Sequence, residues 1–304
     1  MILLKRLLFR AKNIFLGKPK RANNADISIL LCGDFMLDSR IEPYLLKYGM
    51  MYPFRGLMAA MSEYDVRAVN LETPVSNLAG IKWPDKKFNF KGAPYIARML
   101  SRAGFGYASL ANNHILDFGT AVAKDTVNNL NRWEIKSSGV PFAPNPGIVK
   151  SNGYKIAFLS FMDAEIAPEG FEKSVCIYDK RAAEIARAKR AADFVIVSMH
   201  WGEELAPHAS GRQKKIAREI IDAGASVVWG HHPHVIQEME KYKNGFIFYS
   251  LGNFIFSHLS PSITRGMIAG LEVKDNKVKS VRKYIINNDN YLVNYAPRIV
   301  RIVS

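Results

Sequence analysis

The segment Trp229–Val235 holds three of the chain's seven histidines, namely His231, His232 and His234. A glycine precedes them, a proline divides them, and the largely apolar run Ala225–Val228 lies directly before. This order places the imidazoles at the mouth of a predicted strand. Neutral imidazole is the commonest protein ligand for transition metals. The segment therefore indicates a metal site, provided that the rest of the chain supplies more ligands.

Five short apolar runs predict buried strands, and each is followed by a residue that could bind a metal. Ligands in α/β sheets bind beyond the carboxyl ends of the strands, so these residues are expected to share one site. The runs are Ile27–Cys32, Val66–Leu71, Tyr107–Leu110, Phe194–Ser198 and Ser226–Trp229. The residues that follow them are, in the same order, Asp34, Glu72, Asn113 with His114, His200, and His232 with His234.

Each of these residues also has an ordinary structural role open to it. Asp34 could cap a helix or turn, and Asn113 could hold a left-handed turn. Glu72 could be a solvated carboxylate before a proline, and His200 a buried histidine with a hydrogen-bond partner. A residue that could bind a metal follows each of the five predicted strands, however, and this recurrence favours a shared metal site.

Strand and helix patterns alternate along the chain, which predicts an α/β fold. No internal repeat or low-complexity linker interrupts residues 26–304, which we interpret as one domain behind an arm of residues 1–25. The expected helices are Phe54–Met61, Ala93–Ala103, Asp117–Trp133, Asp179–Ala192 and Arg212–Asp222. Further strands are expected at Lys155–Phe161 and, as an antiparallel closing set, at Val235–Met239, Phe246–Leu251, Arg265–Val273 and Val278–Ile286.

The arm carries much of the chain's basic excess. Seven of the 42 lysines and arginines precede the first acid, Asp26, which leaves 35 bases against 27 acids. No stretch of the arm approaches the roughly 20 apolar residues that span a bilayer, and no signal-peptide cleavage site follows an apolar core. We expect residues 1–21 to form an amphipathic helix on an anionic membrane surface, with a disordered tail or a helix packed on the body as alternatives.

This arm predicts a protein associated peripherally with the cytoplasmic membrane, with the cytoplasm as the alternative location. Two cysteines in 304 residues exclude a disulfide framework. The positive charge comes without an aromatic-plus-basic stripe or a reader motif, which argues against a nucleic-acid-binding protein. Lys87, Lys91 and Arg265 lie near the polar motifs and could contact an anion or simply be solvated.

Six motifs of the chain occur in the order in which they stand in a known family. Together they resemble the CapA (poly-γ-glutamate capsule biosynthesis) family, and the resemblance covers about residues 27–273. The motifs are Gly33–Leu37, Asn70–Glu72, Ala111–Gly119, His200–Glu204, Gly230–Gln237 and Tyr249–Phe254.

The CapA family in turn resembles the calcineurin-like metallophosphoesterases, which implies a four-layer α/β/β/α sandwich with a two-metal site at the strand ends. By this resemblance Asp34 matches the first-strand aspartate and Glu72 stands at the bridging carboxylate. Asn113 matches the asparagine ligand and His200 the lone histidine ligand. The paired histidines of the last motif match His232 and His234, and His231 has no ligand role.

The resemblance also implies a general acid, His114, beside the asparagine ligand. Asp117 lies three residues further on and could orient that imidazole, or instead cap the following helix. Carboxylate, amide and imidazole ligands favour Mn, Fe or Zn ions. Two such cations can polarise a phosphoryl oxygen and activate water.

Two positions depart from the metallophosphoesterase pattern. Met36 stands where a second ligand, a histidine, is usual, and Glu72 replaces a shorter aspartate. The site is therefore expected to hold one or two divalent transition metals.

Two functions remain open at this point. The first is a metal-dependent hydrolase that acts on a phosphoester or related bond in capsule or exopolymer biosynthesis. The second is a non-catalytic accessory or anchoring component of capsular polymer assembly and export, for poly-γ-glutamate or a polysaccharide. The expected partners are an anionic polymer or phosphoester substrate, a membrane surface, other capsule-assembly proteins, and no nucleic acid.

Overall fold

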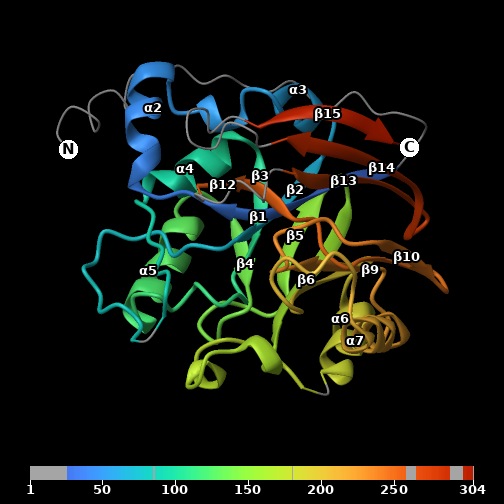
Figure 1. The fold of residues 1–304 in the computed structure, drawn as a ribbon. Coiled ribbons are helices and arrows are strands. Elements are labelled where there is room, and N and C mark those ends of the chain that lie inside the picture. The colour runs from blue at the N-terminus through green and yellow to red at the C-terminus, as the bar shows by residue number, and fades with distance from the viewer. Residues whose placement is uncertain (1–25, 85, 180, 258–264, 288–296, 304) are drawn as a thin grey trace.

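The computed structural model describes residues 26–84, 86–179, 181–257, 265–287 and 297–303. The predicted basic arm thus lies outside the described residues. Within them the chain forms two twisted sheets, each covered by helices on its outer face (Figure 1). The described helices include none that is long and apolar enough to cross a bilayer.

The first sheet has the described strand order β15-β14-β13-β1-β2-β3-β4, with β12 paired to the carboxyl end of β1. Its central strands are parallel, and β13, β14 and β15 extend it in antiparallel fashion. The bounds are β1 Ile27–Met36, β2 Val66–Leu71, β3 Phe105–Ser109, β4 Lys136–Ser138, β12 Asn253–Phe256, β13 Arg265–Lys274, β14 Lys277–Asn287 and β15 Arg298–Val303.

The second sheet has the described order β10-β11-β9-β8-β6-β5, with β7 beside β6. Strands β6, β8, β9 and β11 run parallel to one another, whereas the edge strands β5 and β10 are antiparallel to them. The bounds are β5 Gly147–Ser151, β6 Tyr154–Asp163, β7 Ile177–Tyr178, β8 Phe194–His200, β9 Val227–His231, β10 Met239–Tyr242 and β11 Gly245–Phe248.

Helices cover both outer faces (Figure 1). Ile96 and Leu130 pack α4 and α5 onto the first sheet, while Ile185 and Ile216 pack α6 and α7 onto the second. The helices are α2 Glu42–Tyr48, α3 Met58–Met61, α4 Tyr95–Arg102, α5 Thr120–Asn131, α6 Ala182–Ala191 and α7 Gly211–Asp222, with short 3-10 turns at Ser39–Ile41, Tyr52–Phe54, Ala164–Ile166 and Phe171–Lys173.

Strand β1 explains how the layers hold together. Ile29 and Leu31 point into the apolar layer between the sheets, while Leu30 and Cys32 point into the layer under the helices. This follows from the two-residue period of a strand, and burial on both faces explains the nearly continuous apolar run. The predicted four-layer α/β/β/α sandwich is confirmed.

Two predicted helices were misplaced. The stretch predicted as Phe54–Met61 is α-helical only at Met58–Met61, because a 3-10 turn ends at Phe54 and a turn that contains Gly56 separates the two. The helix predicted from Asp117 begins at Thr120, after Gly119 at φ 84°. No side chain caps this helix, so the capping role left open for Asp117 is wrong.

The prediction of the closing strands was also only partly correct. The strand predicted at Val235–Met239 is wrong, since Ile236 makes one isolated bridge and β10 begins at Met239. The run Phe246–Leu251 ends as a strand at Phe248, and the chain then bends through Gly252 at φ 65°. Strand β12, which was not predicted, follows and lies parallel to β1, so the closing set is not wholly antiparallel.

The parallel strands bring their carboxyl ends to one place between the two sheets. Register pairs Asp34 with Asn70 in the first sheet and His200 with His231 in the second. The indole Nε1 of Trp229 donates across the sheets to the carbonyl of Cys32 at 3.1 Å. Strand β9 is thereby fixed beside β1, immediately before the histidines.

Gly230 is required where β9 passes close to the chain after β11. A Cβ atom there would lie 2.0 Å from the carbonyl oxygen of Tyr249, which belongs to the backbone and cannot easily yield. We expect Gly230→Ala to lower the free energy of unfolding by about 1–3 kcal/mol or more. Gly211→Ala is the matched control, because an added Cβ there meets nothing within 4 Å. Equal urea midpoints for the two variants would contradict this prediction.

Candidate metal centre

The predicted ligand residues converge on one buried site at these strand ends. Asp34, Glu72 and His200 are completely buried, and His232 and His234 nearly so. Asp34 lies in β1, Glu72 directly follows β2, and His200 ends β8. Three elements that are far apart in sequence therefore each deliver one ligand-type side chain.

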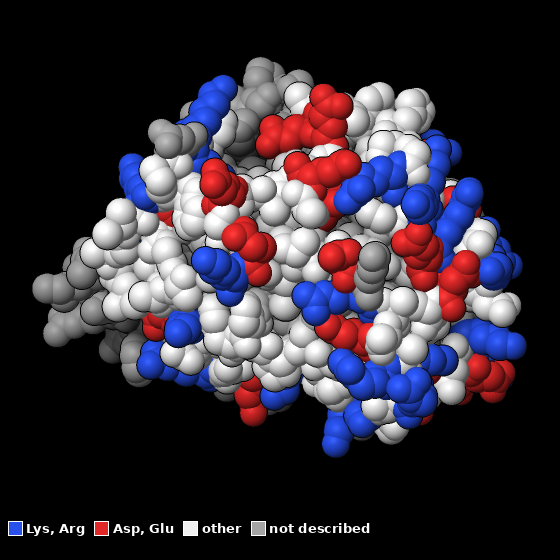
Figure 2. All heavy atoms as spheres, turned by 90° about the horizontal axis from the view of Figure 1, so that it is seen from below, with Lys and Arg blue, Asp and Glu red and all other residues white. Residues whose placement is uncertain are grey.

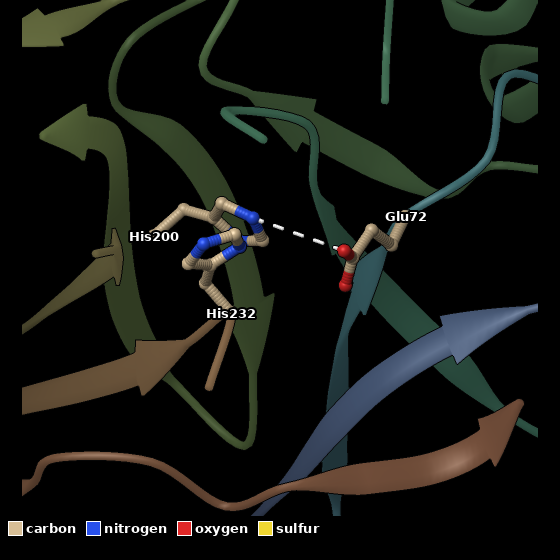
Figure 3. Close-up of side chains that lie close together, drawn as sticks. All are labelled: Glu72, His200 and His232. Carbon is tan, nitrogen blue, oxygen red and sulfur yellow. Dashed lines mark ion pairs between the residues drawn. The ribbon is translucent and has the colours of Figure 1, made fainter. Parts of the chain in front are cut away.

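Ligand atoms gather there in two groups that share Glu72. In one group, atoms of Asp34, Glu72 and His234 lie within 4.8 Å of one another, and in the second, atoms of Glu72, His200 and His232 do so. Figure 3 shows His200 and His232 side by side facing the Glu72 carboxylate, with His200 Nε2 3.8 Å from Glu72 Oε1. Glu72 thus occupies the position of a carboxylate that could bridge two cations.

Asn113 lies beside the second group. Its Oδ1 atom is 3.1 Å from Nε2 of His200, so the amide oxygen faces the imidazole from the opposite sheet. The asparagine is the neutral oxygen donor of the predicted ligand set.

Several polar atoms in this site have no hydrogen-bond partner among the described residues. They include Oε1 of Glu72 and Nδ1 of both His200 and His232, all shielded from solvent. Each buried polar atom that lacks a hydrogen-bond partner lowers the stability of the folded protein by roughly 1–3 kcal/mol. Atoms of this kind on carboxylate and imidazole groups fit a site built for a divalent cation.

Asp34 is the best-satisfied charge of the site. Its Oδ1 accepts hydrogen bonds of 2.9 Å from Asn70 Nδ2 and from His231 Nδ1. Burial raises the pKa of Asp34, but the bonds from His231 and His234 outweigh it and hold that pKa well below its usual range. His231, for which no ligand role was expected, therefore supports the aspartate directly.

The pKa of Glu72 is shifted in the opposite direction to that of Asp34. Burial, together with the neighbouring charge of Asp34, raises its pKa well above the usual range. The Nδ2 amide of Asn70 donates to both Asp34 and, at 3.3 Å, Oε2 of Glu72, and so holds the two carboxylates in one arrangement. Two adjacent carboxylates require a compensating positive charge.

The histidines divide by environment. Burial lowers the pKa of His200 well below its usual range and that of His232 to about 3, so both are neutral imidazoles that can bind a metal. Burial also acts against a charge on His234, but Glu72 and Asp34 raise its pKa to about 10. Its Nδ1 lies 2.9 Å from Asn253 Oδ1, and its Nε2 3.6 Å from Glu72 Oε1.

The backbone at the paired histidines is unusual. His232 has φ 94° and His234 has φ 58°, a region that residues other than glycine seldom adopt. Such strain persists where surrounding structure imposes it and gathers at functional sites. The turn thereby directs both imidazoles toward Glu72.

The predicted general acid, His114, lies at the edge of this site. Its Nδ1 is 2.7 Å from Oδ2 of Asp117, the arrangement expected if Asp117 orients the ring. Burial lowers the pKa of His114 to about 4. Its ring stacks on Phe90 with centroids 4.3 Å apart, and the backbone N–H of Phe90 donates to Asp117 at 2.6 Å.

One cation of this cluster was missed by sequence reasoning. Lys86 Nζ lies 2.5 Å from Oδ1 of Asp117 and 3.0 Å from Nδ1 of His114. Of the bases named from sequence, Lys87 and Arg265 are exposed, and Lys91 donates to backbone carbonyls away from this cluster. Nothing in the sequence separates Lys86 from its neighbour Lys87, because a loop has no period that predicts which side chain turns inward.

Met36 serves as a packing residue of the apolar core. It is completely buried in a small cluster with Phe90 and Phe256. The Phe256 ring also lies 4.9 Å from that of His234. The position at which the metallophosphoesterase pattern has a histidine is therefore occupied in this chain by a packed apolar side chain.

The fold and site define a four-layer α/β protein with a carboxylate–imidazole centre between its sheets. Residues 28–258 match the family described as bacterial capsule synthesis protein PGA_cap. The chain belongs to this family, which confirms the resemblance seen in its motifs.

Two relatives of this chain are longer than the chain itself. The capsule biosynthesis protein CapA of Bacillus anthracis is 32% identical over 252 residues, which cover 78% of this chain and 61% of that protein. The PGA biosynthesis protein CapA of Bacillus subtilis (strain 168) is 31% identical over 251 residues, covering 79% and 66% respectively. The chain thus spans less than two thirds of either relative.

Two further likenesses are weaker. A probable polyglutamine synthesis accessory protein of Mycobacterium tuberculosis (strain ATCC 25618 / H37Rv) is 29% identical over 214 residues, covering 63% of this chain and 55% of that protein. A hypothetical protein from Thermus thermophilus has a crystal structure with TM-score 0.55 and 17% identity, covering 86% of this chain and 99% of that one. At that identity the likeness concerns the fold alone.

The buried charge on Glu72 predicts a trade-off between metal binding and stability. In the presence of a chelator, we expect Glu72→Gln to raise the free energy of unfolding by about 1–3 kcal/mol at pH 8, because it removes a buried carboxylate with an unpartnered oxygen. Since the folded-state pKa is raised, the gain should be absent below the ordinary glutamate range and grow as the pH rises above it.

Urea titrations at several pH values measure this gain. Glu219→Gln, at an exposed position of α7, is the control and should change stability by less than about 0.5 kcal/mol. A Glu72→Gln variant that is less stable than wild type in chelator at pH 8 would sink the prediction.

Proposed function

We propose that this protein is a metal-dependent hydrolase that acts on a phosphoester or related bond during assembly of an anionic capsular polymer. The observation that carries the proposal is the pair of ligand groups joined at Glu72, with His114 directly after Asn113, whose side chain contacts His200. Of the fully buried side chains at the site, the carboxylate of Glu72 is the one that belongs to both groups.

The proposed ligands are Asp34, Glu72 and His234 for one cation, and Glu72, His200 and His232 with Asn113 for another. One or two ions of Mn, Fe or Zn suit this donor set. When bound, such ions offset charge on phosphoryl oxygens and activate water.

The chain's own residues supply the proton handling. Asp117 accepts from Nδ1 of His114 and fixes the orientation of the ring, and Phe90 covers one of its faces. Because burial lowers the pKa of His114 to about 4, this role requires a bound anionic substrate to keep the ring protonated, and its Nε2 proton could then pass to a leaving oxygen. Lys86 keeps a positive charge next to Asp117, which suits an anionic substrate.

The polymer context rests on the relatives. Those from Bacillus are named for capsule and PGA biosynthesis and the mycobacterial one for polyglutamine synthesis, so involvement in capsule or poly-γ-glutamate production is the function they support. Other capsule-assembly proteins are proposed as partners.

A non-catalytic accessory role is the second candidate, and one observation favours it. Met36 fills the place of a ligand with an apolar side chain packed on Phe90 and Phe256. A site weakened in this way could bind a metal without turning over a substrate.

Activity assays separate the two candidates. We expect the purified protein to hold at least one transition metal per chain by elemental analysis and to hydrolyse generic phosphomonoesters or diesters. His114→Ala should lower kcat by about 10²–10⁴-fold, the typical contribution of a general acid, with metal content unchanged. His208→Ala, which alters an exposed histidine outside the site, should leave kcat unchanged. Metal binding without hydrolysis would favour the accessory role, and a protein that stays metal-free and inert after Mn²⁺ or Zn²⁺ addition would refute the enzyme.

Nucleic acid is not proposed as a partner. On the face under α6 and α7, Figure 2 shows basic and acidic side chains interspersed. Arg181 pairs with Glu184 and Arg218 with Glu240 among the described residues. The described residues of this face therefore do not form the continuous positively charged surface that binds a phosphate backbone.

We further propose that residues 1–21 attach the protein peripherally to an anionic membrane surface. The sequence supports this, because seven bases alternate there with apolar residues. Full-length protein should co-sediment with phosphatidylserine vesicles, and a variant that begins at Ala25 should bind far less. Binding of the full-length protein should fall with added salt, since the Debye length shrinks from about 10 Å at 0.1 M to 3 Å at 1 M. Equal binding of both proteins would remove the membrane proposal.

A further inference from the structure

A carboxylate outside the predicted ligand set lies at the mouth of the metal centre. Ligand atoms of Glu204, His232 and His234 lie within 4.8 Å of one another. Both histidines are buried, and Nδ1 of His232 has no hydrogen-bond partner among the described residues. Glu204 is exposed, so its side chain approaches the imidazoles from the solvent side.

The loop that carries Glu204 is fastened to the histidine turn. The N–H of Leu205 donates to the carbonyl of Pro233, between the two imidazoles, at 2.9 Å. The side chain of Gln237 donates to the carbonyl of Ala206, also at 2.9 Å. Glu204 is therefore held over the site by its immediate neighbours and does not depend on a chance position of a free loop.

Glu204 shares His234 with the group formed by Asp34 and Glu72, and this group is the one for which Met36 offers no ligand. Asp34, Glu72 and His234 supply three donors, and Met36 cannot supply the fourth because its side chain packs among aromatic rings. Glu204 already acts on this region, since its charge is among those that raise the pKa of Glu72, after burial and Asp34.

We propose that Glu204 is the ligand that replaces the missing histidine, binding through a carboxylate oxygen the cation held by Asp34, Glu72 and His234. The inference rests on the proposed metal centre. It gives this position three carboxylates and one imidazole, a donor set that suits Mn²⁺, whereas the position at His200 and His232 is richer in imidazole and suits Zn²⁺ or Fe.

Calorimetric titration of the metal-free full chain with Mn²⁺ tests this inference. Loss of a residue that only supports a ligand lowers metal affinity roughly 10–100-fold, so loss of a ligand should lower it at least tenfold. Glu204→Gln should therefore weaken one Mn²⁺ site by at least about tenfold and leave the other unchanged. Glu203→Gln, the adjacent exposed carboxylate that belongs to no ligand group among the described residues, should bind Mn²⁺ like wild type.

A third variant tests the metal preference. Glu204→His restores a donor of the usual type, so it should recover binding at the weakened site with Zn²⁺ favoured over Mn²⁺ relative to wild type. Electron paramagnetic resonance of bound Mn²⁺ gives a readout independent of hydrolysis.

The outcomes are distinguishable. Unchanged Mn²⁺ affinity in Glu204→Gln, or equal losses in the two glutamine variants, overturns the role of Glu204 and leaves the metal centre standing. A wild-type chain that binds neither Mn²⁺ nor Zn²⁺ overturns the metal centre itself.

Discussion

Two carboxylates buried side by side are the constraint on which this structure depends. Asp34 and Glu72 are shielded from water and share the amide of Asn70. In isolation such a pair would be strongly destabilising. The fold compensates for this destabilisation by placing imidazoles from β9 and the following turn against the carboxylates. The strained turn at His232 and His234 is part of the same arrangement. The site is thus held by the fold at the expense of local stability, as is common where function requires preorganised charge.

Much of the fold could be predicted from local sequence pattern. Strand ends such as Asp34, Glu72 and His200 were found because a buried parallel strand leaves a continuous apolar run that stops at a polar residue. The four layers were implied by the family resemblance, since alternation along β1 alone does not say which layer each face meets. Helix starts were less accurate: α5 was predicted to begin at Asp117 but begins at Thr120, and the Asp117 carboxylate contacts Lys86 and His114 instead of capping the helix.

The parts of the site that sequence could not predict come from contacts between distant loops. Lys86 and Glu204 lie in irregular segments, and their importance depends on where the chain folds back. His231 was set aside because its neighbours matched the ligand pattern, yet it lies 2.9 Å from Asp34 across 197 residues of sequence. Asn253 begins β12, a strand that was not predicted because the predicted strand before it ended at Leu251. The hydrophobic pattern along the chain does not show which distant residues will contact one another.

The position of β1 also governs when the site can form during synthesis. This first described strand pairs with β2, but also with β12 and with β13 as far as Val273. A ribosome must therefore translate the chain at least as far as Val273 before the strand that carries Asp34 has all its described neighbours. Until then its apolar residues have no partner on one edge, and such exposed strands aggregate readily. Nascent chains of this protein are thus expected to need protection by chaperones until β13 has been made.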